Sequence, residues 1–144
     1  MSTVISVSGL QKSYGTNRAV AGVDLEIRQG EIFALLGPNG AGKTTTVEIL
    51  EGFRHRDGGT VSVLGFDPAT RGGAAQSWRD RIGIVLQPTH DAGDLTVLES
   101  VTHFAGYYSN PKNPREVLDL VGLSDKADSL GRTLSGDQDR KSTR

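Results

Sequence analysis

The sequence has no cysteine, almost no net charge and no long apolar run, and each absence excludes a class of protein. Without cysteine there is neither a disulfide scaffold nor a thiolate metal site. A formal net charge of −1 argues against nonspecific binding to nucleic acid or to an anionic membrane. No stretch approaches the roughly 20 consecutive apolar residues of a membrane span, and the N-terminus lacks a signal-peptide pattern. We therefore expect a cytoplasmic protein that would reach a membrane only through a partner.

The composition is that of a folded domain. The chain has 144 residues, of which 35% are hydrophobic and 23% charged, so it is long enough to bury a core. Mixed strand and helix patterns occupy the first part, and helical patterns follow. We predict a strand-rich region with a mixed strand-and-helix core over 1–90, a helical region over 91–134, and a short terminal segment over 135–144.

The most informative stretch runs from Glu31 to Thr45. Its apolar run Ile32–Leu36 predicts a buried strand, and Thr44–Glu51 predicts a helix. The segment between them, Gly37–Thr44, has the phosphate-loop pattern G-x-x-x-x-G-K-[ST]. Glycines let backbone N–H groups turn toward an oxyanion, and the helix N-terminus adds partial positive charge. The alternative is an ordinary glycine turn between a strand and a helix.

Hydrophobic periodicity outlines the remaining elements. The predicted strands are Val4–Ser8, Ala19–Ile27, Thr60–Leu64 and Ile82–Leu86, and the predicted helices are Gln76–Arg81, Val97–Tyr108 and Arg115–Val121. Trp78 is interpreted as an apolar anchor. The residues expected to face inward are Val97, Val101, Phe104 and Tyr108 in one helix and Val117, Leu118 and Val121 in another, which Gly122 should end.

With the phosphate loop, Gln87 and Leu134–Gln138 together, the chain resembles the nucleotide-binding subunit of an ABC transporter. The bacterial drug- and antibiotic-export type is the most similar, judging by Val63–Pro68 and Leu95–Val97. The resemblance implies an α/β fold of the P-loop NTPase class, in its ABC form. It covers only the N-terminal part of that domain, with a β-subdomain and a helical subdomain.

The resemblance also implies roles for particular residues. Tyr14 would stack on adenine, although its local sequence fits a half-buried surface tyrosine equally well. Lys43 would reach the β- and γ-phosphates, and Thr44 and Gln87 would contact Mg²⁺. Gln87 would also touch the attacking water and link the nucleotide state to a membrane partner. The implied ATP-binding residues are Tyr14, Gly37, Pro38, Asn39, Gly40, Ala41, Gly42, Lys43, Thr44, Thr45, Ser135, Gly136 and Gln138, and the implied catalytic residues are Lys43 and Gln87.

Leu134–Gln138 resembles the signature segment of this family, L-S-G-G-Q. In the family this signature segment caps the γ-phosphate held by the opposite protomer. The resemblance therefore implies a head-to-tail homodimer that binds and hydrolyses MgATP. Hydrolysis would power export through a separate integral-membrane permease, which places the subunit at the inner face of the cell membrane. Three alternatives stay open: a non-catalytic nucleotide-binding remnant, a soluble ABC-type ATPase, and a P-loop nucleotide kinase, which the signature-like segment disfavours.

Two departures from the family pattern matter. Asp137 stands where the signature has its second glycine. Its repulsion of a γ-phosphate, about 4 kcal/mol for unit charges 4 Å apart at an effective dielectric of 20, outweighs helix capping of about 0.3–1 kcal/mol. Secondly, these 144 residues contain no apolar strand ending in Asp-Glu and no switch histidine after Gln138. We expect part of a longer gene product that folds poorly and does not hydrolyse ATP by itself.

Overall fold

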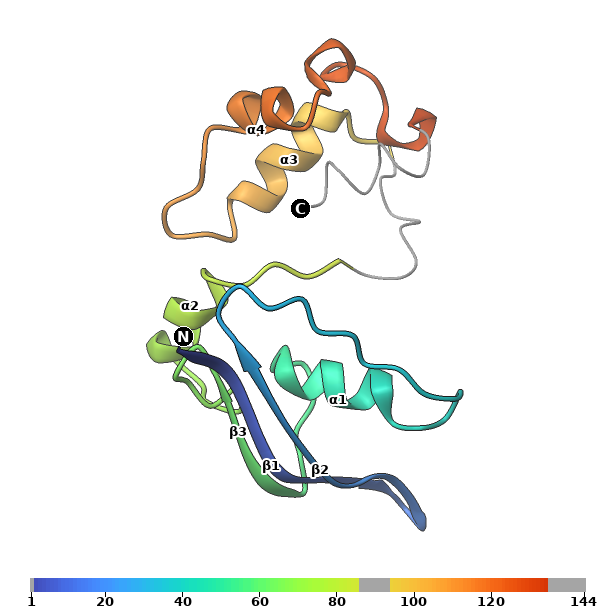
Figure 1. The fold of residues 1–144 in the computed structure, drawn as a ribbon. Helices are drawn as coiled ribbons and strands as arrows, with labels where there is room; N and C mark the ends of the chain where they lie inside the picture. Colours follow the sequence, from blue (N-terminus) through green and yellow to red (C-terminus); the bar gives the residue numbers. More distant parts are fainter. Residues whose placement is uncertain (1, 86–93, 135–144) are drawn as a thin grey trace. The chain divides into compact units, whose positions relative to one another are not determined.

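The computed structural model describes residues 2–85 and 94–134. The chain forms two compact units, the first ending at Trp78 and the second beginning at Arg79. The first unit holds a sheet with two helices, and the second holds short helices (Figure 1). No helix among the described residues is long and apolar enough to span a bilayer.

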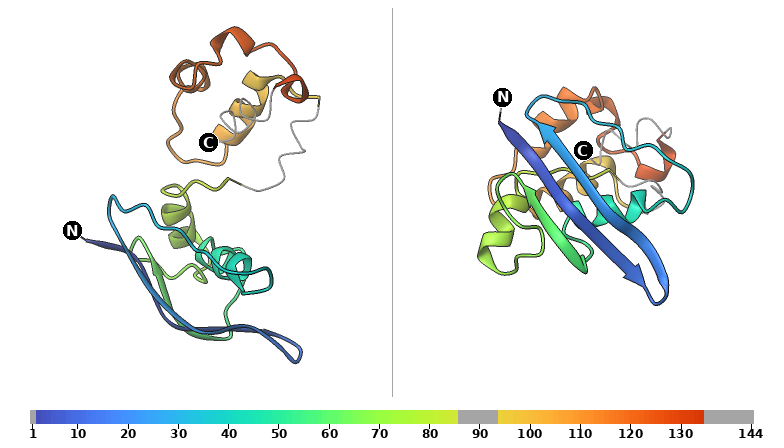
Figure 2. Two further views of the ribbon diagram at one scale, coloured as in Figure 1. Left: turned by 45° about the vertical axis from the view of Figure 1, so that its right-hand side comes forward. Right: turned by 60° about the horizontal axis from the view of Figure 1, so that its bottom comes forward.

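Three antiparallel strands form the sheet of the first unit, in the order β2-β1-β3. They are β1 (Thr3–Tyr14), β2 (Asn17–Arg28) and β3 (Gly58–Val63). The pattern predicted these strands, but β1 and β2 are longer than expected. Both continue past register shifts to form a long hairpin that turns between Tyr14 and Asn17 (Figure 2). The residues at these irregular positions break the apolar–polar alternation, which explains the short prediction.

The core of the first unit lies between the sheet and helices α1 (Lys43–Leu50) and α2 (Gly73–Arg79). Helix α1 contacts β2 and β3. The largest fully buried side chains of this unit are Leu10, Ile49 and Trp78, and each contributes roughly 1.5–3 kcal/mol by leaving water. The prediction that Trp78 is an apolar anchor is confirmed, although its helix begins and ends earlier than expected.

The two predicted buried strands are wrong for the residues described. Residues 31–38 have no regular structure, and the side chains of Ile32 and Leu36 are 99% and 86% exposed. Residues 82–85 likewise form no strand, and Leu86 lies outside the described residues. A buried strand needs hydrogen-bonding neighbours on its edges. The three described strands pair only with one another, so these two runs have no ladder within the described part of the chain.

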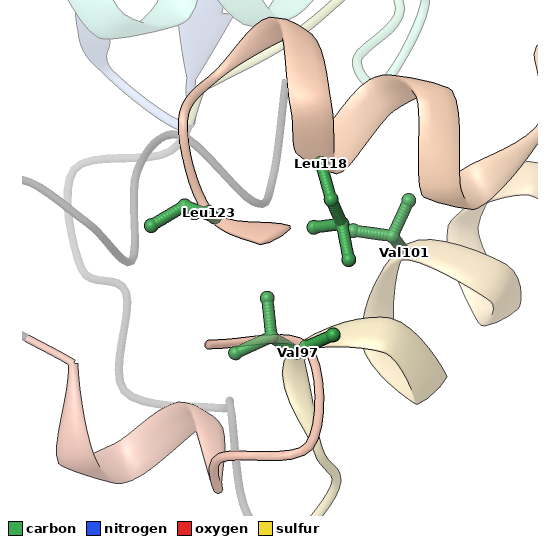
Figure 3. Packing of buried hydrophobic residues seen from close by; sticks show 5 residues of the cluster. Val97, Val101, Leu118 and Leu123 are labelled. Atoms are coloured by element: carbon green, nitrogen blue, oxygen red, sulfur yellow. The ribbon is translucent and has the colours of Figure 1, made fainter. Parts of the chain in front are cut away.

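The second unit is helical. It contains α3 (Val97–Ala105), α4 (Pro114–Leu120) and the 3-10 helices η1 (Ser124–Lys126) and η2 (Gly131–Thr133). Side chains of α3 and α4 point toward one another and close a small core (Figure 3). The buried members of this core are Val97, Val101, Leu118, Leu123 and Ala127.

Helix α3 begins with a capping box. The Thr96 side chain accepts from the Glu99 N–H, and the Glu99 carboxylate accepts from the Thr96 N–H at 2.8 Å. The helix ends at Ala105, so the predicted inward face is only half right. Val97 and Val101 are buried, whereas Phe104 and Tyr108 are 43% and 41% exposed.

Helix α4 matches its prediction closely. Leu118 is buried, and Val117 and Val121 pack against the same core. Gly122 follows with φ of 70°, a left-handed conformation that glycine adopts without strain. The pattern was sufficient here because the Asn113 cap, Pro114 in the first turn and the Gly122 stop mark both ends of the helix in the local sequence.

Candidate functional site

The phosphate loop lies between the irregular segment 31–36 and helix α1, in the first unit. Gly40 and Gly42 have φ of 82° and 78°, so the backbone turns through the left-handed region at alternate residues. The Ala41 N–H donates to the Pro38 carbonyl at 3.3 Å and closes the turn. Left-handed turns of this kind direct backbone N–H groups to one side, which suits an anion.

Steric contact with β2 also requires glycine at position 42. A Cβ built at this position would lie 2.2 Å from the Ala19 carbonyl oxygen and 3.1 Å from Val20 Cγ2, both on β2. At Gly40 the same construction meets nothing within 4 Å. The loop therefore approaches the hairpin closely at Gly42, and only glycine fits there. The contact sets the loop against the sheet without help from the apolar run that precedes it.

Lys43 folds back over the loop. Its ammonium donates to the Gly37 carbonyl at 2.7 Å and to the Pro38 carbonyl at 2.6 Å. The side chain is half-buried, so these contacts hold a positive charge at the mouth of the loop. An anion bound there would compete for the same ammonium protons.

Helix α1 begins at Lys43 with its N-terminal N–H groups open to other partners. Its N-cap is Gly42, which has no side chain to accept from them, and its first turn contains no acidic residue. These N–H groups and the helix dipole favour an anion at this end. Thr44 is exposed there, while Thr46 and Ile49 are buried against the sheet.

Tyr14 lies at the end of β1, and the residue is 40% exposed. Two cations stand near the ring, Lys12 from the same strand and Arg54 from the connection after α1. No sequence pattern indicates that Arg54 would come close. Only the spacing of Lys12 and Tyr14 on one strand face could have suggested a partner for the ring.

Carboxylates hold both cations. Hydrogen bonds from Lys12, and then from the Ser13 N–H, hold the pKa of the Asp57 carboxyl below its ordinary value. The hydrogen bond with Glu48 raises the pKa of the Arg54 guanidinium, and Tyr14 adds to the same effect. The Asp57 carboxylate and the Arg54 guanidinium therefore both stay charged over the physiological pH range.

Several predicted site residues lie outside the described residues. They are Gln87, Ser135, Gly136 and Gln138, so their predicted roles remain predictions. The described loop residues and Lys43, Thr44 and Thr45 form one continuous segment, and Tyr14 belongs to the same unit. No group of three or more histidine, aspartate or glutamate side chains that could hold a metal occurs in the described ranges 2–85 and 94–134.

A shallow hollow of about 420 Å³ lies elsewhere, on the second unit. Leu95, Leu98, Glu99, Thr102 and His103 line it, and no predicted site residue is among them. His103 at its rim contacts Phe104 and Tyr107 edge-on, with ring centroids 5.8 and 5.3 Å apart.

Comparison with known proteins reveals close relatives. The chain is 39% identical over 145 residues to Nod factor export ATP-binding protein I of Ralstonia nicotianae, covering 97% of this chain and 44% of the relative. It is 35% identical over 144 residues to the methionine import ATP-binding protein MetN of Mesorhizobium japonicum, covering 96% and 40%. The chain thus spans less than half the length of these curated relatives. One of them exports and the other imports, so the drug-export type is not confirmed.

The fold has counterparts among solved structures. The structure of cbiO1 from Clostridium perfringens, part of the ABC transporter complex cbiONQ, superimposes with a TM-score of 0.81 at 22% identity. The match covers 99% of this chain and 60% of that one, which confirms the predicted ABC ATPase fold in its N-terminal portion. The family model described as ABC transporter matches residues 20–143. The chain therefore belongs to the ABC transporter family.

Proposed function

We propose that this chain supplies the ATP-binding part of the nucleotide-binding subunit of an ABC transporter. The observation that carries the proposal is the phosphate loop. Gly42 seats it against β2, and the loop leads into a helix N-terminus with no side-chain cap. Within a member of this family, that arrangement suits the phosphates of ATP.

Binding would require Lys43 to exchange its partners. Its ammonium would leave the Gly37 and Pro38 carbonyls and donate to β- and γ-phosphate oxygens, where it would offset charge during attack by water. The left-handed turns at Gly40 and Gly42 would present backbone N–H groups to the same oxygens. Tyr14 would offer a ring face to the adenine.

The residues present fit Mg²⁺ in the way that nucleotide sites hold it. Mg²⁺ in such sites is bound by few protein groups together with phosphate oxygens, and when bound it neutralises charge on the phosphates. The exposed Thr44 hydroxyl lies at the start of α1 beside the loop. We propose Thr44 as a ligand, with Gln87 as a second.

In the whole protein, we propose that ATP hydrolysis powers export through a separate membrane permease, with two nucleotide-binding subunits in a head-to-tail dimer. Export of a drug or antibiotic is the finer proposal, and the Nod factor export relative supports the direction. The methionine import relative favours the opposite direction as the second candidate. The direction of ATP-dependent transport, measured with a labelled cargo in sealed vesicles that carry the permease, would decide between export and import.

The first experiment is ATP binding to the purified chain, measured by calorimetry. We expect saturable binding that Lys43→Ala weakens at least about tenfold, because charge-assisted hydrogen bonds are lost. Lys112→Ala is the matched control, since this exposed lysine lies in the other unit. Absent binding, or equal affinity for ATP in Lys43→Ala and the parent chain, would contradict the proposal. We further expect these 144 residues to bind ATP without turnover.

A further inference from the structure

The ring of Tyr14 has two positively charged neighbours. Lys12 Nζ lies 5.5 Å from the ring centroid, and Arg54 Cζ lies 5.4 Å from it. Both distances fall within the roughly 6 Å range over which a cation is attracted to an aromatic face. The orientation of a partly exposed ring thus depends on where these two cations are held.

The two cations are held by different parts of the unit. Lys12 Nζ donates to Asp57 Oδ1 at 2.7 Å, and Lys12 and Tyr14 are alternate residues on β1. That pairing follows from the strand itself. Arg54 comes from another segment, and its Nε donates to Glu48 Oε2 at 2.5 Å.

Glu48 connects this contact to the phosphate loop. It lies on α1, the helix whose first residue is Lys43. A backbone hydrogen bond joins the same two residues, because the Arg54 N–H donates to the Glu48 carbonyl at 3.1 Å. The side chains of Arg54 and Glu48 are only 36% and 24% exposed, so the ion pair is better shielded than a free surface pair. A continuous chain of contacts therefore runs from the loop helix through Arg54 to Tyr14.

We propose that Arg54 is a positioning residue of the nucleotide site, which holds the Tyr14 ring in a fixed relation to the phosphate loop through Glu48. The inference rests on the proposed function, in which the loop binds the phosphates and Tyr14 the base. Arg54 contacts neither group in this scheme. It restricts the ring before the base arrives, so less freedom is lost when the nucleotide binds.

The proposal predicts different effects on ligands with and without an adenine base. Removing Arg54 should weaken any ligand that uses the Tyr14 ring and spare a ligand that uses the loop alone. ATP is the first kind of ligand and inorganic tripolyphosphate is the second. The comparison separates positioning of the ring from a general loss of positive charge, which would weaken both anions.

The test measures the affinities of ATP and tripolyphosphate for the chain and its variants by calorimetry. Arg54→Gln and Glu48→Gln should each weaken ATP about three- to tenfold and leave tripolyphosphate unchanged. In a Tyr14→Ala background, Arg54→Gln should produce no further loss. Arg28→Gln is the control, because Arg28 lies at the opposite end of the hairpin, where it pairs with Glu26.

A second measurement needs no nucleotide. Proton NMR should show the Tyr14 ring resonances shifted in both Arg54→Gln and Glu48→Gln, with the remaining spectrum preserved as evidence of folding. Equal losses for both anions, or a loss that persists without Tyr14, would overturn the positioning role. An effect of Arg54→Gln without one of Glu48→Gln would overturn the connection through α1. If the parent chain bound neither anion, the nucleotide site itself would be refuted, and the role of Arg54 with it.

Discussion

Replacing Gly42 by alanine tests the contact that seats the phosphate loop. The added Cβ would stand 2.2 Å from the Ala19 carbonyl oxygen, which belongs to the backbone of β2 and has little room to move. Gly40→Ala is a matched control in the same loop. Gly40 has φ of 82° against 78° at Gly42, but a Cβ there meets nothing within 4 Å.

Both substitutions strain the backbone, but only one of them also creates a steric clash. Placing alanine in the left-handed region destabilises each variant by roughly 1–2 kcal/mol. Only Gly42→Ala adds overpacking against β2, which typically destabilises by about 1–3 kcal/mol. We therefore expect a loss of about 2–5 kcal/mol for Gly42→Ala and about 1–2 kcal/mol for Gly40→Ala.

Urea denaturation followed by far-UV circular dichroism measures both losses. At a slope of about 1–3 kcal/mol per molar urea, the midpoints of the two variants should differ by roughly 0.3–3 M. Equal midpoints would refute the close approach of the loop to β2. A lower midpoint for Gly40→Ala would show that the loop is packed on a different side.

Further predictions concern the two units separately. Thr96→Ala removes the capping box of α3 and should lower the stability of the second unit by about 1 kcal/mol in thermal unfolding, whereas Thr102→Ala, at an exposed position of the same helix, should change it by less than about 0.5 kcal/mol. Hydrogen bonds from Arg56 hold the pKa of the Asp67 carboxyl below its ordinary value of 3.8. The ion pair between Arg56 and Asp67 therefore stabilises the fold by about 0.5–1 kcal/mol above pH 3.8, and this stabilisation is lost as the pH falls through the lower pKa of the folded state. The difference in unfolding free energy between the parent chain and Asp67→Asn should accordingly disappear below that lower pKa. Ile32→Ser should leave the free energy of unfolding within about 0.5 kcal/mol of the parent, since the side chain is 99% exposed.

Local patterns predict the elements whose formation depends on local sequence. The predicted phosphate-loop helix agrees with α1 to within one residue at each end, because glycines and the Lys-Thr sequence mark its start. Helix α4 and its stop at Gly122 agree equally well. In these segments the turn residues and the periodicity agree, so the local sequence is enough to place the ends of each helix.

Elements that depend on distant partners could not be predicted in the same way. The hairpin strands continue through register shifts that no alternation reveals. At the candidate site, the motif predicted the loop and the family resemblance implied a role for Tyr14, but neither held any sign of the ion pair between Arg54 and Glu48. Such a contact joins segments through tertiary structure, and neither spacing nor periodicity encodes it.

The exposed run Ile32–Leu36 shows what the site does and does not depend on. An apolar run becomes a strand only when neighbouring edges complete its hydrogen bonds, and the described strands β1, β2 and β3 pair only with one another. The loop that follows the run nevertheless holds its turns. Gly42 rests on β2, Lys43 bridges the loop carbonyls, and α1 buries Ile49 against the sheet. Phosphate binding should therefore depend on the antiparallel hairpin and α1, and should survive changes at Ile32 that leave those contacts intact.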